Sequence, residues 1–259
     1  MVAKSSFVTV CGRKLEVQRI AGAKAGAPTI VFLHEGLGSV AMWRDFPKRV
    51  AEATGCPVVV YSRYGYGKSD VRQAPLAVRY MHDEGLEALP EFLDTLGIDE
   101  PILFGHSDGG SIALIHAGAH DRVKALILEA PHVFVEDVSV QSIAAAKVAY
   151  ETTDFAQKLA RYHADAERTF RAWNDMWLDP AFRAWNIEEY LPRVECPVLA
   201  IQGRDDEYGT LAQIEAIARQ AKGPVELLAL ERCGHSPHRD QPEAVIEAVK
   251  RFVWELRRE

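Results

Sequence analysis

The sequence predicts an α/β fold: a mostly parallel sheet of about eight strands, flanked by helices on both faces, with a small helical cap. Short β-branched apolar runs alternate with helix-compatible segments from residue 28 onward, and this alternation is typical of a parallel sheet covered by helices. Prolines stand just before several of these runs, where a missing N–H costs little. One stretch, residues 136–191, is rich in aromatic residues and helix formers and contains no convincing strand.

The first expected element is an antiparallel hairpin formed by Ser6–Cys11 and Lys14–Ile20, with a turn at Gly12. The other expected strands are apolar runs that follow turn-like segments: Thr29–Leu33, Val58–Tyr61, Ile102–Phe104, Val123–Leu128, Val198–Gln202 and Val225–Leu230. Helical patterns lie between the runs, at about 43–53, 77–97, 108–119, 209–221 and 241–257. We therefore expect a single domain whose core consists of residues 1–135 and 192–259.

Residues 136–191 are expected to form the helical cap, inserted after the Val123–Leu128 strand. The segments with helical patterns are Ser142–Thr152, Asp154–Ala164, Ala166–Leu178 and Asp179–Leu191. Phe170, Trp173 and Trp177 are spaced i, i+3, i+7, so they share one helix face. We expect this aromatic stripe to pack the cap onto the core; it can also line a pocket for an apolar or aromatic substrate.

Composition sets limits on the class of protein. The chain has 259 residues, 48% of them hydrophobic and 26% charged, which is ordinary for a soluble globular domain. The net charge is −7 with both signs interspersed, so neither nucleic acid nor an anionic membrane is an expected partner. No apolar run approaches the ~20 residues of a membrane span, and Met1–Val10 lacks the apolar region of a signal peptide.

Four cysteines, at positions 11, 56, 196 and 233, are far apart, and no two form a C-x-x-C pair. We expect buried reduced thiols rather than a disulfide framework or a metal site. A cytoplasmic location follows as the default.

The pentapeptide Gly105-His106-Ser107-Asp108-Gly109 fits G-x-S-x-G and lies between an apolar run and a helix-compatible segment. In a strand-to-helix turn of this kind the serine has a strained backbone, and glycines on either side leave room for the turn. The turn exposes the hydroxyl above the edge of the sheet. This context predicts that Ser107 is a nucleophile.

A serine hydroxyl needs a base to accept its proton and an acid to orient that base. In a sheet of this order the acid and then the histidine should follow the serine, each on a loop beyond a strand. Asp206 follows the next-to-last predicted strand, and His235 follows the last. Asp205 remains an alternative acid. His238 is the nearest rival base, and H-x-x-H without further ligands is poor evidence for a metal.

Acyl transfer also needs two preorganised N–H groups that stabilise the oxyanion. We expect one from the backbone of Asp108. The other should come from the loop at 34–39, whose glycines allow close backbone approach. The N–H of Gly36 is the first choice, and that of Leu37 the second.

Five motifs occur in one order: H-x-G-x-G-S at 34–39, R-Y-G-Y-G-K-S at 63–69, G-H-S-D-G-G at 105–110, G-R-D-D at 203–206 and C-G-H-S at 233–236. With these motifs the chain resembles the α/β-hydrolase superfamily, in its capped group of esterases, haloperoxidase-like enzymes and carbon–carbon bond hydrolases. The resemblance covers nearly the whole length outside the cap. It implies that Ser107 is the nucleophile, Asp206 the acid and His235 the base.

Two residues depart from the family's pattern. Glu35 stands where relatives usually have glycine, and a carboxylate beside the oxyanion hole opposes the developing charge unless it points away or is paired. We expect Glu35 to turn outward and tie down a neighbouring loop; a substrate-facing role is the alternative. Asp108 stands where the family often has an uncharged residue. The helix N-terminus stabilises an aspartate there, and selection of a positive or hydrogen-donating substrate is the alternative.

The remaining candidates surround this constellation. His34 and His106 are expected to be structural hydrogen-bonding residues. Residues 63–69 lack phosphate-loop spacing and are interpreted as a structural turn. The candidate substrate contacts are His34, Glu35, His132, Trp173 and Trp177.

Together these features predict a serine hydrolase that acts on a small or medium carboxylic ester through an acyl-enzyme, without a cofactor or metal. Two alternatives remain open. One is a carbon–carbon bond hydrolase acting on ring-cleavage products. The other is a ligand receptor built on the same fold. The sequence leaves the oligomeric state undetermined.

Overall fold

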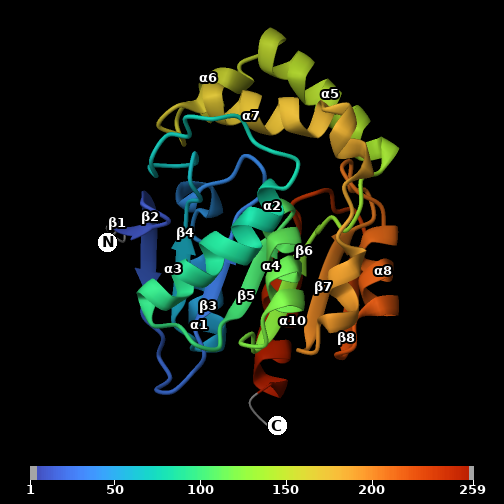
Figure 1. Ribbon diagram of the computed structural model, residues 1–259. Coiled ribbons are helices and arrows are strands. Elements are labelled where there is room, and N and C mark those ends of the chain that lie inside the picture. The colour runs from blue at the N-terminus through green and yellow to red at the C-terminus, as the bar shows by residue number, and fades with distance from the viewer. Residues whose placement is uncertain (1–4, 257–259) are drawn as a thin grey trace.

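A single sheet with the strand order β1-β2-β4-β3-β5-β6-β7-β8 organises the computed structural model (Figure 1), which describes residues 5–256. The strands are β1 Ser6–Val10, β2 Arg13–Ile20, β3 Ile30–Leu33, β4 Val58–Tyr61, β5 Ile102–His106, β6 Ala125–Glu129, β7 Val198–Gly203 and β8 Val225–Leu230. Strand β2 pairs antiparallel with β1 and β4, and every later pairing is parallel. The predicted α/β architecture, with its opening hairpin, is therefore confirmed.

The helices of the core are α1 Phe46–Thr54, α2 Tyr80–Asp83, α3 Leu89–Leu96, α4 Asp108–Ala119, α8 Ala212–Gln220, α9 Pro237–Asp240 and α10 Pro242–Glu255. Short turns at Val40–Trp43 (η1) and Glu84–Ala88 (η2) complete this set. The helix expected at 77–97 begins only at Tyr80, and a π-helical turn interrupts it. Position 257, the expected end of the last helix, lies outside the described residues.

Alternate residues of the strands point to opposite faces of the sheet, as the period of a strand requires. On β3, Val31 and Leu33 belong to the apolar cluster that contains α3, α4 and α8. Ile30 and Phe32 belong to the cluster that contains α1 and α10. Because helices cover both faces, the central strands are fully buried. Because these strands are parallel, their carboxyl ends meet at one edge of the sheet.

The segment 136–191 lies over that edge of the sheet (Figure 1). It contains α5 Asp137–Thr152, α6 Phe155–Leu159, α7 Ala166–Leu178, and the 3₁₀ turns η3 Pro180–Ala184 and η4 Glu188–Arg193. The helix expected at 154–164 is shorter than predicted, and the one expected at 179–191 is wrong, because η3 and η4 replace it. Phe170, Trp173 and Trp177 are all buried, as their shared face requires.

Two expectations from composition can be compared with the structure. Cys56 and Cys233 are buried, but Cys11 is exposed and Cys196 is half-buried, so the prediction of four buried thiols is wrong for these two. Among the described residues, no helix has both the length and the apolar character needed to cross a bilayer.

Candidate active site

Ser107 lies in a strained turn between β5 and α4. Its φ is 53° and its ψ is −118°, a conformation that costs a non-glycine residue roughly 1–3 kcal/mol. The turn is tight because the backbone passes very close to its neighbours. A Cβ on Gly109 would lie 2.1 Å from the carbonyl oxygen of Leu33, and one on Gly105 would lie 2.4 Å from that of Gly109. The local structure is thus the strand–turn–helix that the pentapeptide predicts.

The structure brings Ser107, His235 and Asp206 together. The Nε2 atom of His235 lies 2.9 Å from Oγ of Ser107, and its Nδ1 lies 2.9 Å from both carboxylate oxygens of Asp206. This geometry suits an imidazole whose Nδ1–H donates to the carboxylate and whose Nε2 accepts the serine hydroxyl proton. The loops that carry these three side chains follow β5, β8 and β7.

The carboxylate of Asp206 is held by several donors besides His235. It accepts hydrogen bonds from the N–H of Tyr208 at 2.8 Å, the N–H of Gly209 at 3.3 Å and Nε2 of Gln202 at 2.5 Å. Burial alone would raise the pKa of Asp206, but His235 and the N–H of Tyr208 outweigh burial and lower it. The rival acid, Asp205, is exposed and lies in the same loop.

The backbone N–H groups of Gly36, Leu37 and Asp108 remain available beside the serine. Within residues 5–256, no main-chain carbonyl accepts a hydrogen bond from any of them. Gly36 and Asp108 line one cavity with Ser107. Gly36 is in contact with α7, since a Cβ there would lie 2.1 Å from Nε1 of Trp173. Only glycine fits this position without displacing the indole. Leu37, the second choice of donor, also lines the cavity.

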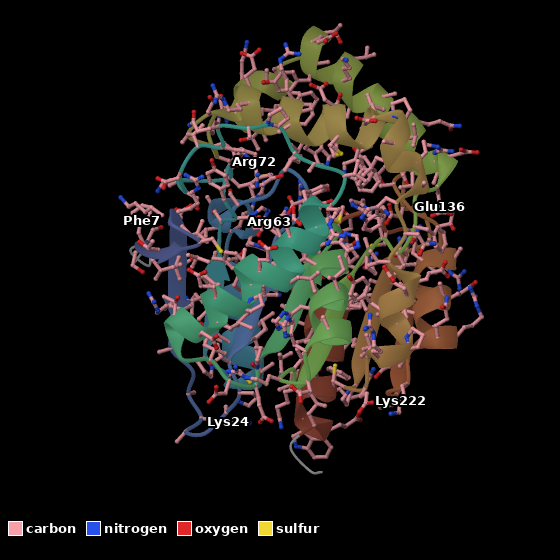
Figure 2. The ribbon with its side chains drawn as sticks, in the orientation of Figure 1. Phe7, Lys24, Arg63, Arg72, Glu136 and Lys222 are labelled. Carbon is pink, nitrogen blue, oxygen red and sulfur yellow. The ribbon has the colours of Figure 1, made fainter. Side chains whose placement is uncertain are left out.

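His34 fixes the loop that carries Gly36. Its Nδ1 donates to the carbonyl of Glu35 at 2.7 Å, and its Nε2 accepts from the N–H of Arg63 at 3.0 Å. The guanidinium of Arg63 also donates to the carbonyl of Glu35 at 2.9 Å. Arg63 is fully buried, and Figure 2 labels it near the middle of the molecule. His34 is fully buried with both ring nitrogens bonded, and it is not among the residues that line the cavity.

Glu35 does not turn outward as the sequence led us to expect. Its Oε2 lies 3.6 Å from Nδ1 of His106, its side chain is 25% exposed, and the residue lines the cavity. Burial acts to raise the pKa of Glu35, but His106, then His34 and His238, outweigh it and hold the pKa far below its usual range. The carboxylate beside the oxyanion loop is therefore paired with an imidazole.

The side chain of Asp108 has partners on other elements of the core. Its Oδ2 accepts a 2.7 Å hydrogen bond from the hydroxyl of Tyr80 and lies 3.7 Å from the guanidinium of Arg63. The same hydroxyl accepts a hydrogen bond from Nε1 of Trp177 at 3.2 Å. Burial raises the pKa of Asp108 and outweighs the opposing effects of Arg63 and Tyr80. Tyr80 could not be identified from the sequence, because a lone tyrosine outside any motif looks like a core residue.

The cavity that contains Ser107 has a volume of about 260 Å³. Its apolar lining is Leu37, Met42, Ile143, Phe155, Leu159, Trp173 and Trp177, and its polar lining includes Glu35, His132, Ser139, Glu207, Tyr208 and Arg239. Of the five candidate substrate contacts, all but His34 line it. Burial, with a smaller contribution from His235, lowers the pKa of His132 to about 3, so its imidazole is neutral. The sequence did not single out Tyr208, whose ring lies 4.7 Å from that of His235.

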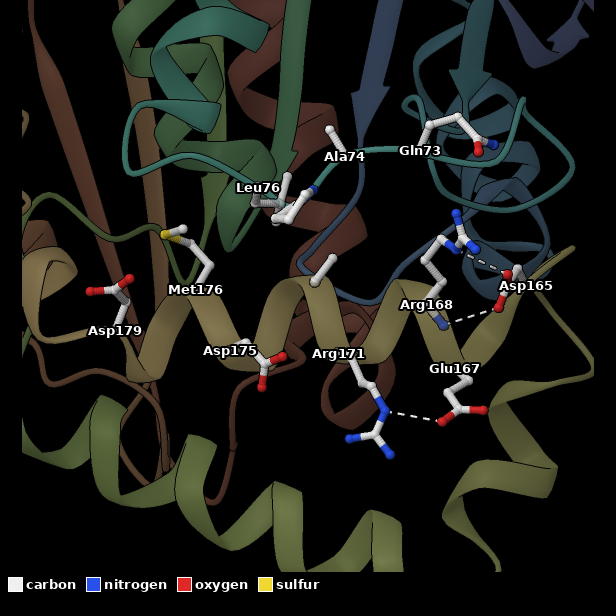
Figure 3. Close-up of a pocket in the computed structure, with 12 residues that line it drawn as sticks. Gln73, Ala74, Leu76, Asp165, Glu167, Arg168, Arg171, Asp175, Met176 and Asp179 are labelled. Atoms are coloured by element: carbon white, nitrogen blue, oxygen red, sulfur yellow. Dashed lines mark hydrogen bonds and ion pairs between the residues drawn. The ribbon is translucent and has the colours of Figure 1, made fainter.

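A second, larger groove of about 610 Å³ lies between α7 and the loop at 73–76 (Figure 3). Charged side chains of α7 line it, and two of its ion pairs, Arg171–Glu167 and Arg168–Asp165, are drawn there. Ser107, His235 and Asp206 are all absent from its lining. We therefore assign the candidate site to the smaller cavity.

One cluster in the described part of the chain has side chains of the kind that bind metals: His106, Glu129 and His238, with ligand-type atoms within 4.8 Å of one another. However, Nδ1 of His238 is only 2.7 Å from Oε2 of Glu129, and Nε2 of His106 is 2.6 Å from the carbonyl of His235. These are hydrogen-bond distances, so we interpret the cluster as a set of hydrogen-bonded side chains rather than a metal site.

Residues 30–248 match the model of the alpha/beta hydrolase family. The chain belongs to this family. It is 31% identical over 112 residues to a proline iminopeptidase of Lactobacillus delbrueckii subsp. bulgaricus. The matched region covers 42% of this chain and only 38% of that protein. It is 26% identical over 265 residues to the 2-hydroxy-6-oxononadienedioate/2-hydroxy-6-oxononatrienedioate hydrolase 1 of Dechloromonas aromatica, with 90% and 89% of the two chains covered.

Solved structures show the same fold. An esterase from Exiguobacterium antarcticum superposes with a TM-score of 0.75 at 19% identity, over 97% of this chain and 100% of that one. The relatives named here are a peptidase, an oxononadienedioate hydrolase and an esterase, so the comparisons establish the family and the fold but not the bond that this chain cleaves.

Proposed function

We propose that this protein is a serine hydrolase that cleaves a small or medium carboxylic ester through a covalent acyl-enzyme. The observation that carries the proposal is the continuous hydrogen-bonded chain from Ser107 through His235 to Asp206. This chain of hydrogen bonds begins at Ser107, which has a strained backbone and lines the cavity. Nucleophile, base and acid are each of the residue type that the chemistry needs.

In the first half-reaction, Oγ of Ser107 attacks the ester carbonyl carbon as its proton passes to Nε2 of His235. The carbonyl oxygen becomes an oxyanion, which the N–H groups of Asp108 and Gly36 stabilise, with Leu37 as the alternative second donor. The imidazolium then protonates the leaving alkoxide as the carbon–oxygen bond breaks, and the alcohol departs.

In the second half-reaction, a water molecule transfers a proton to His235 and attacks the acyl carbon. The imidazolium returns this proton to Ser107 as the acyl–serine bond breaks, and the carboxylic acid leaves. Asp206 remains ionised throughout and stabilises the imidazolium, in line with its lowered pKa.

The cavity supports a small, mainly apolar acyl group. Its volume of about 260 Å³ is just below the range of roughly 300–1,000 Å³ that is usual for ligand pockets. Trp173, Trp177 and Ile143 of the segment 136–191 form its apolar side. We infer that this segment acts as a cap, which excludes water from the acyl group and selects its size.

Carbon–carbon bond hydrolysis is the second candidate, because the motifs resemble that group of the family and a relative named as a 2-hydroxy-6-oxononadienedioate hydrolase aligns over 90% of this chain. It would use the same serine, histidine and aspartate. A panel containing p-nitrophenyl esters, a dienoate ring-cleavage product and a prolyl amide separates these chemistries. We expect the highest kcat/KM on a short-chain ester. Steady turnover beyond one equivalent argues against a ligand receptor.

The nucleophile is tested with a fluorophosphonate probe that reacts with activated serines. We expect stoichiometric labelling of the wild type and none of Ser107→Ala. Ser111→Ala is the matched control. Ser111 lies one helical turn away, and its hydroxyl donates a hydrogen bond to the carbonyl of His132 at 2.6 Å. Labelling that persists in Ser107→Ala would overturn the proposal.

A further inference from the structure

Four ionisable side chains, three of them buried and one partly exposed to the cavity, lie near His235 and outside the three residues of the proposed triad. They come from separate elements: the loop after β3, the end of β5, the end of β6, and α9. These residues are Glu35, His106, Glu129 and His238. The proposed reaction uses none of them, and burying two carboxylates is costly unless each is paired.

His106 is the centre of this group. Its Nε2–H donates to the carbonyl of His235 at 2.6 Å, so a side chain beside the nucleophile holds the loop that carries the base. Its Nδ1 faces Oε2 of Glu35 at 3.6 Å, an ion-pair distance, and this nitrogen has no hydrogen-bond partner among the described residues. Because Glu35 belongs to the oxyanion loop, His106 contacts both of the loops that must stay aligned with Ser107.

His238 and Glu129 form a second pair, and His238 lies in α9, directly after the loop that carries His235. Nδ1 of His238 donates to Oε2 of Glu129 at 2.7 Å, and both side chains are at least 94% buried. Glu129 is the register partner of His106 on the neighbouring strand. Trp43 covers the group on its other side, with ring centroids 6.1 Å from His106 and 4.7 Å from His238. Such shielding from water strengthens the charge interactions within.

We propose that His106 is a positioning residue whose imidazolium holds two loops, the His235 loop through Nε2–H and the oxyanion loop through the Nδ1–H that faces Glu35, and that Glu35 is the counter-charge that keeps both ring nitrogens protonated. The proposal explains why a carboxylate stands where relatives usually have glycine. Its charge is neutralised by His106 rather than left to oppose the oxyanion. The inference rests on the proposed function of Ser107 and His235.

The electrostatics agree with this geometry. Burial alone would lower the pKa of His106, but Glu35 first, then Glu129 and the carbonyl of His235, more than offset it and raise the pKa to about 8. The rings of His235 and His238 also face His106, at centroid distances of 5.2 and 5.1 Å. Loss of the His106 proton therefore occurs just above neutral pH, where it removes the charge that Glu35 requires.

The test compares kcat–pH profiles of the wild type, Glu35→Gln and His106→Gln with a short-chain ester. We expect wild-type kcat to fall above about pH 8. In Glu35→Gln the fall should move to lower pH. In His106→Gln it should vanish, while kcat below pH 8 drops roughly tenfold for loss of one charged hydrogen bond. KM of His106→Gln should change little, since His106 does not line the cavity.

His116→Gln is the matched control, because it also replaces a buried histidine that bonds a backbone carbonyl, that of Gly85. It should keep the wild-type profile. Histidine ring NMR of the full chain in the Ser107→Ala background gives a second readout, in which the His106 resonance should titrate near pH 8 and shift down in Glu35→Gln.

Two results would overturn the inference: an unchanged alkaline limb in both Glu35→Gln and His106→Gln, or stoichiometric bound metal in the purified wild type that Glu129→Gln removes. These outcomes differ from failure of the proposed function. In that case Ser107→Ala keeps its activity whatever the profiles show.

Discussion

The two walls of the cavity are built from different kinds of residue. The wall formed by the strand ends carries Ser107, Asp108 and His235 and is backed by buried charges and hydrogen bonds. The wall formed by the segment 136–191 presents Ile143, Trp173 and other apolar side chains. Charge and hydrogen-bond geometry can position a reacting proton, whereas apolar packing can only select size and exclude water. On the proposed function, the wall of strand ends carries out the chemistry, and the wall formed by the segment 136–191 selects the substrate.

The two walls are nevertheless connected at several points. Trp173 packs against Gly36 of the oxyanion loop, and Trp177 reaches Asp108 through the hydroxyl of Tyr80. His163, which precedes α7, donates through Nε2 to the carbonyl of Leu37 at 2.9 Å. The apolar wall therefore also holds the backbone groups that the chemistry needs, and the following variants measure how far that dependence goes.

The largest effect is expected within the strand-end wall. Asp206→Asn should lower kcat by roughly 10⁴, because an amide no longer fixes the tautomer of His235 or stabilises the imidazolium. Asp205→Asn, in the same loop but exposed, should keep kcat within a factor of about three of the wild type, since surface substitutions usually change little. Initial rates at saturating ester decide between them. The reverse order would move the acid to Asp205.

The next effect comes from the contact between the walls. In Gly36→Ala the added methyl group would lie 2.1 Å from Nε1 of Trp173, so either the indole or the oxyanion loop must shift. Displacing one donor should lower kcat by roughly 10². The double variant Gly36→Ala/Trp173→Ala removes the clash and should recover part of that loss, as a double-mutant cycle would show. A double variant no better than Gly36→Ala would mean that the walls act independently.

A smaller effect is a pH-dependent stability. The pKa of His106 is about 8 in the folded chain, against 6.5 for an ordinary histidine. The stabilisation that protonated His106 contributes to the folded state is therefore complete below pH 6.5 and is lost as the pH rises through 8. The difference amounts to about 2 kcal/mol. Urea unfolding of the wild type and His106→Gln should show their stability gap shrinking by that amount between pH 6 and 9. A constant gap would contradict the assignment.

The strand-end wall could be predicted from sequence because short motifs encode it. The turn around Ser107 demands glycines at fixed positions, and the positions of Asp206 and His235 follow from strand order. The direction of the Glu35 side chain could not be predicted. It depends on His106, which is adjacent in the sheet but distant in sequence, and on the spacing of two parallel strands. The pairing of Asp108 with Tyr80 was missed for the same reason.

The segment 136–191 was predicted less well. Its aromatic spacing identified the buried face of α7, but the stretch at 179–191 forms 3₁₀ turns instead of a helix. Pro180 begins η3 and Pro192 lies within η4, and each removes a backbone donor that a helix running on from α7, or on past residue 191, would use. Helical composition alone does not reveal where such a segment breaks, because packing against the core decides it.

The smallest effect tests the hydrogen-bonded connection alone. Tyr80→Phe keeps the ring but removes the hydroxyl that donates to Asp108 and accepts from Trp177. We expect a loss of roughly 1 kcal/mol in the free energy of unfolding and a severalfold lower kcat, because the N–H of Asp108 is less firmly placed. Tyr150→Phe, on the outer helix α5, is the matched control and should change neither. If kcat of Tyr80→Phe equals that of the wild type while stability falls, the connection holds the fold but not the oxyanion donors, and the two walls separate as chemistry and substrate fit.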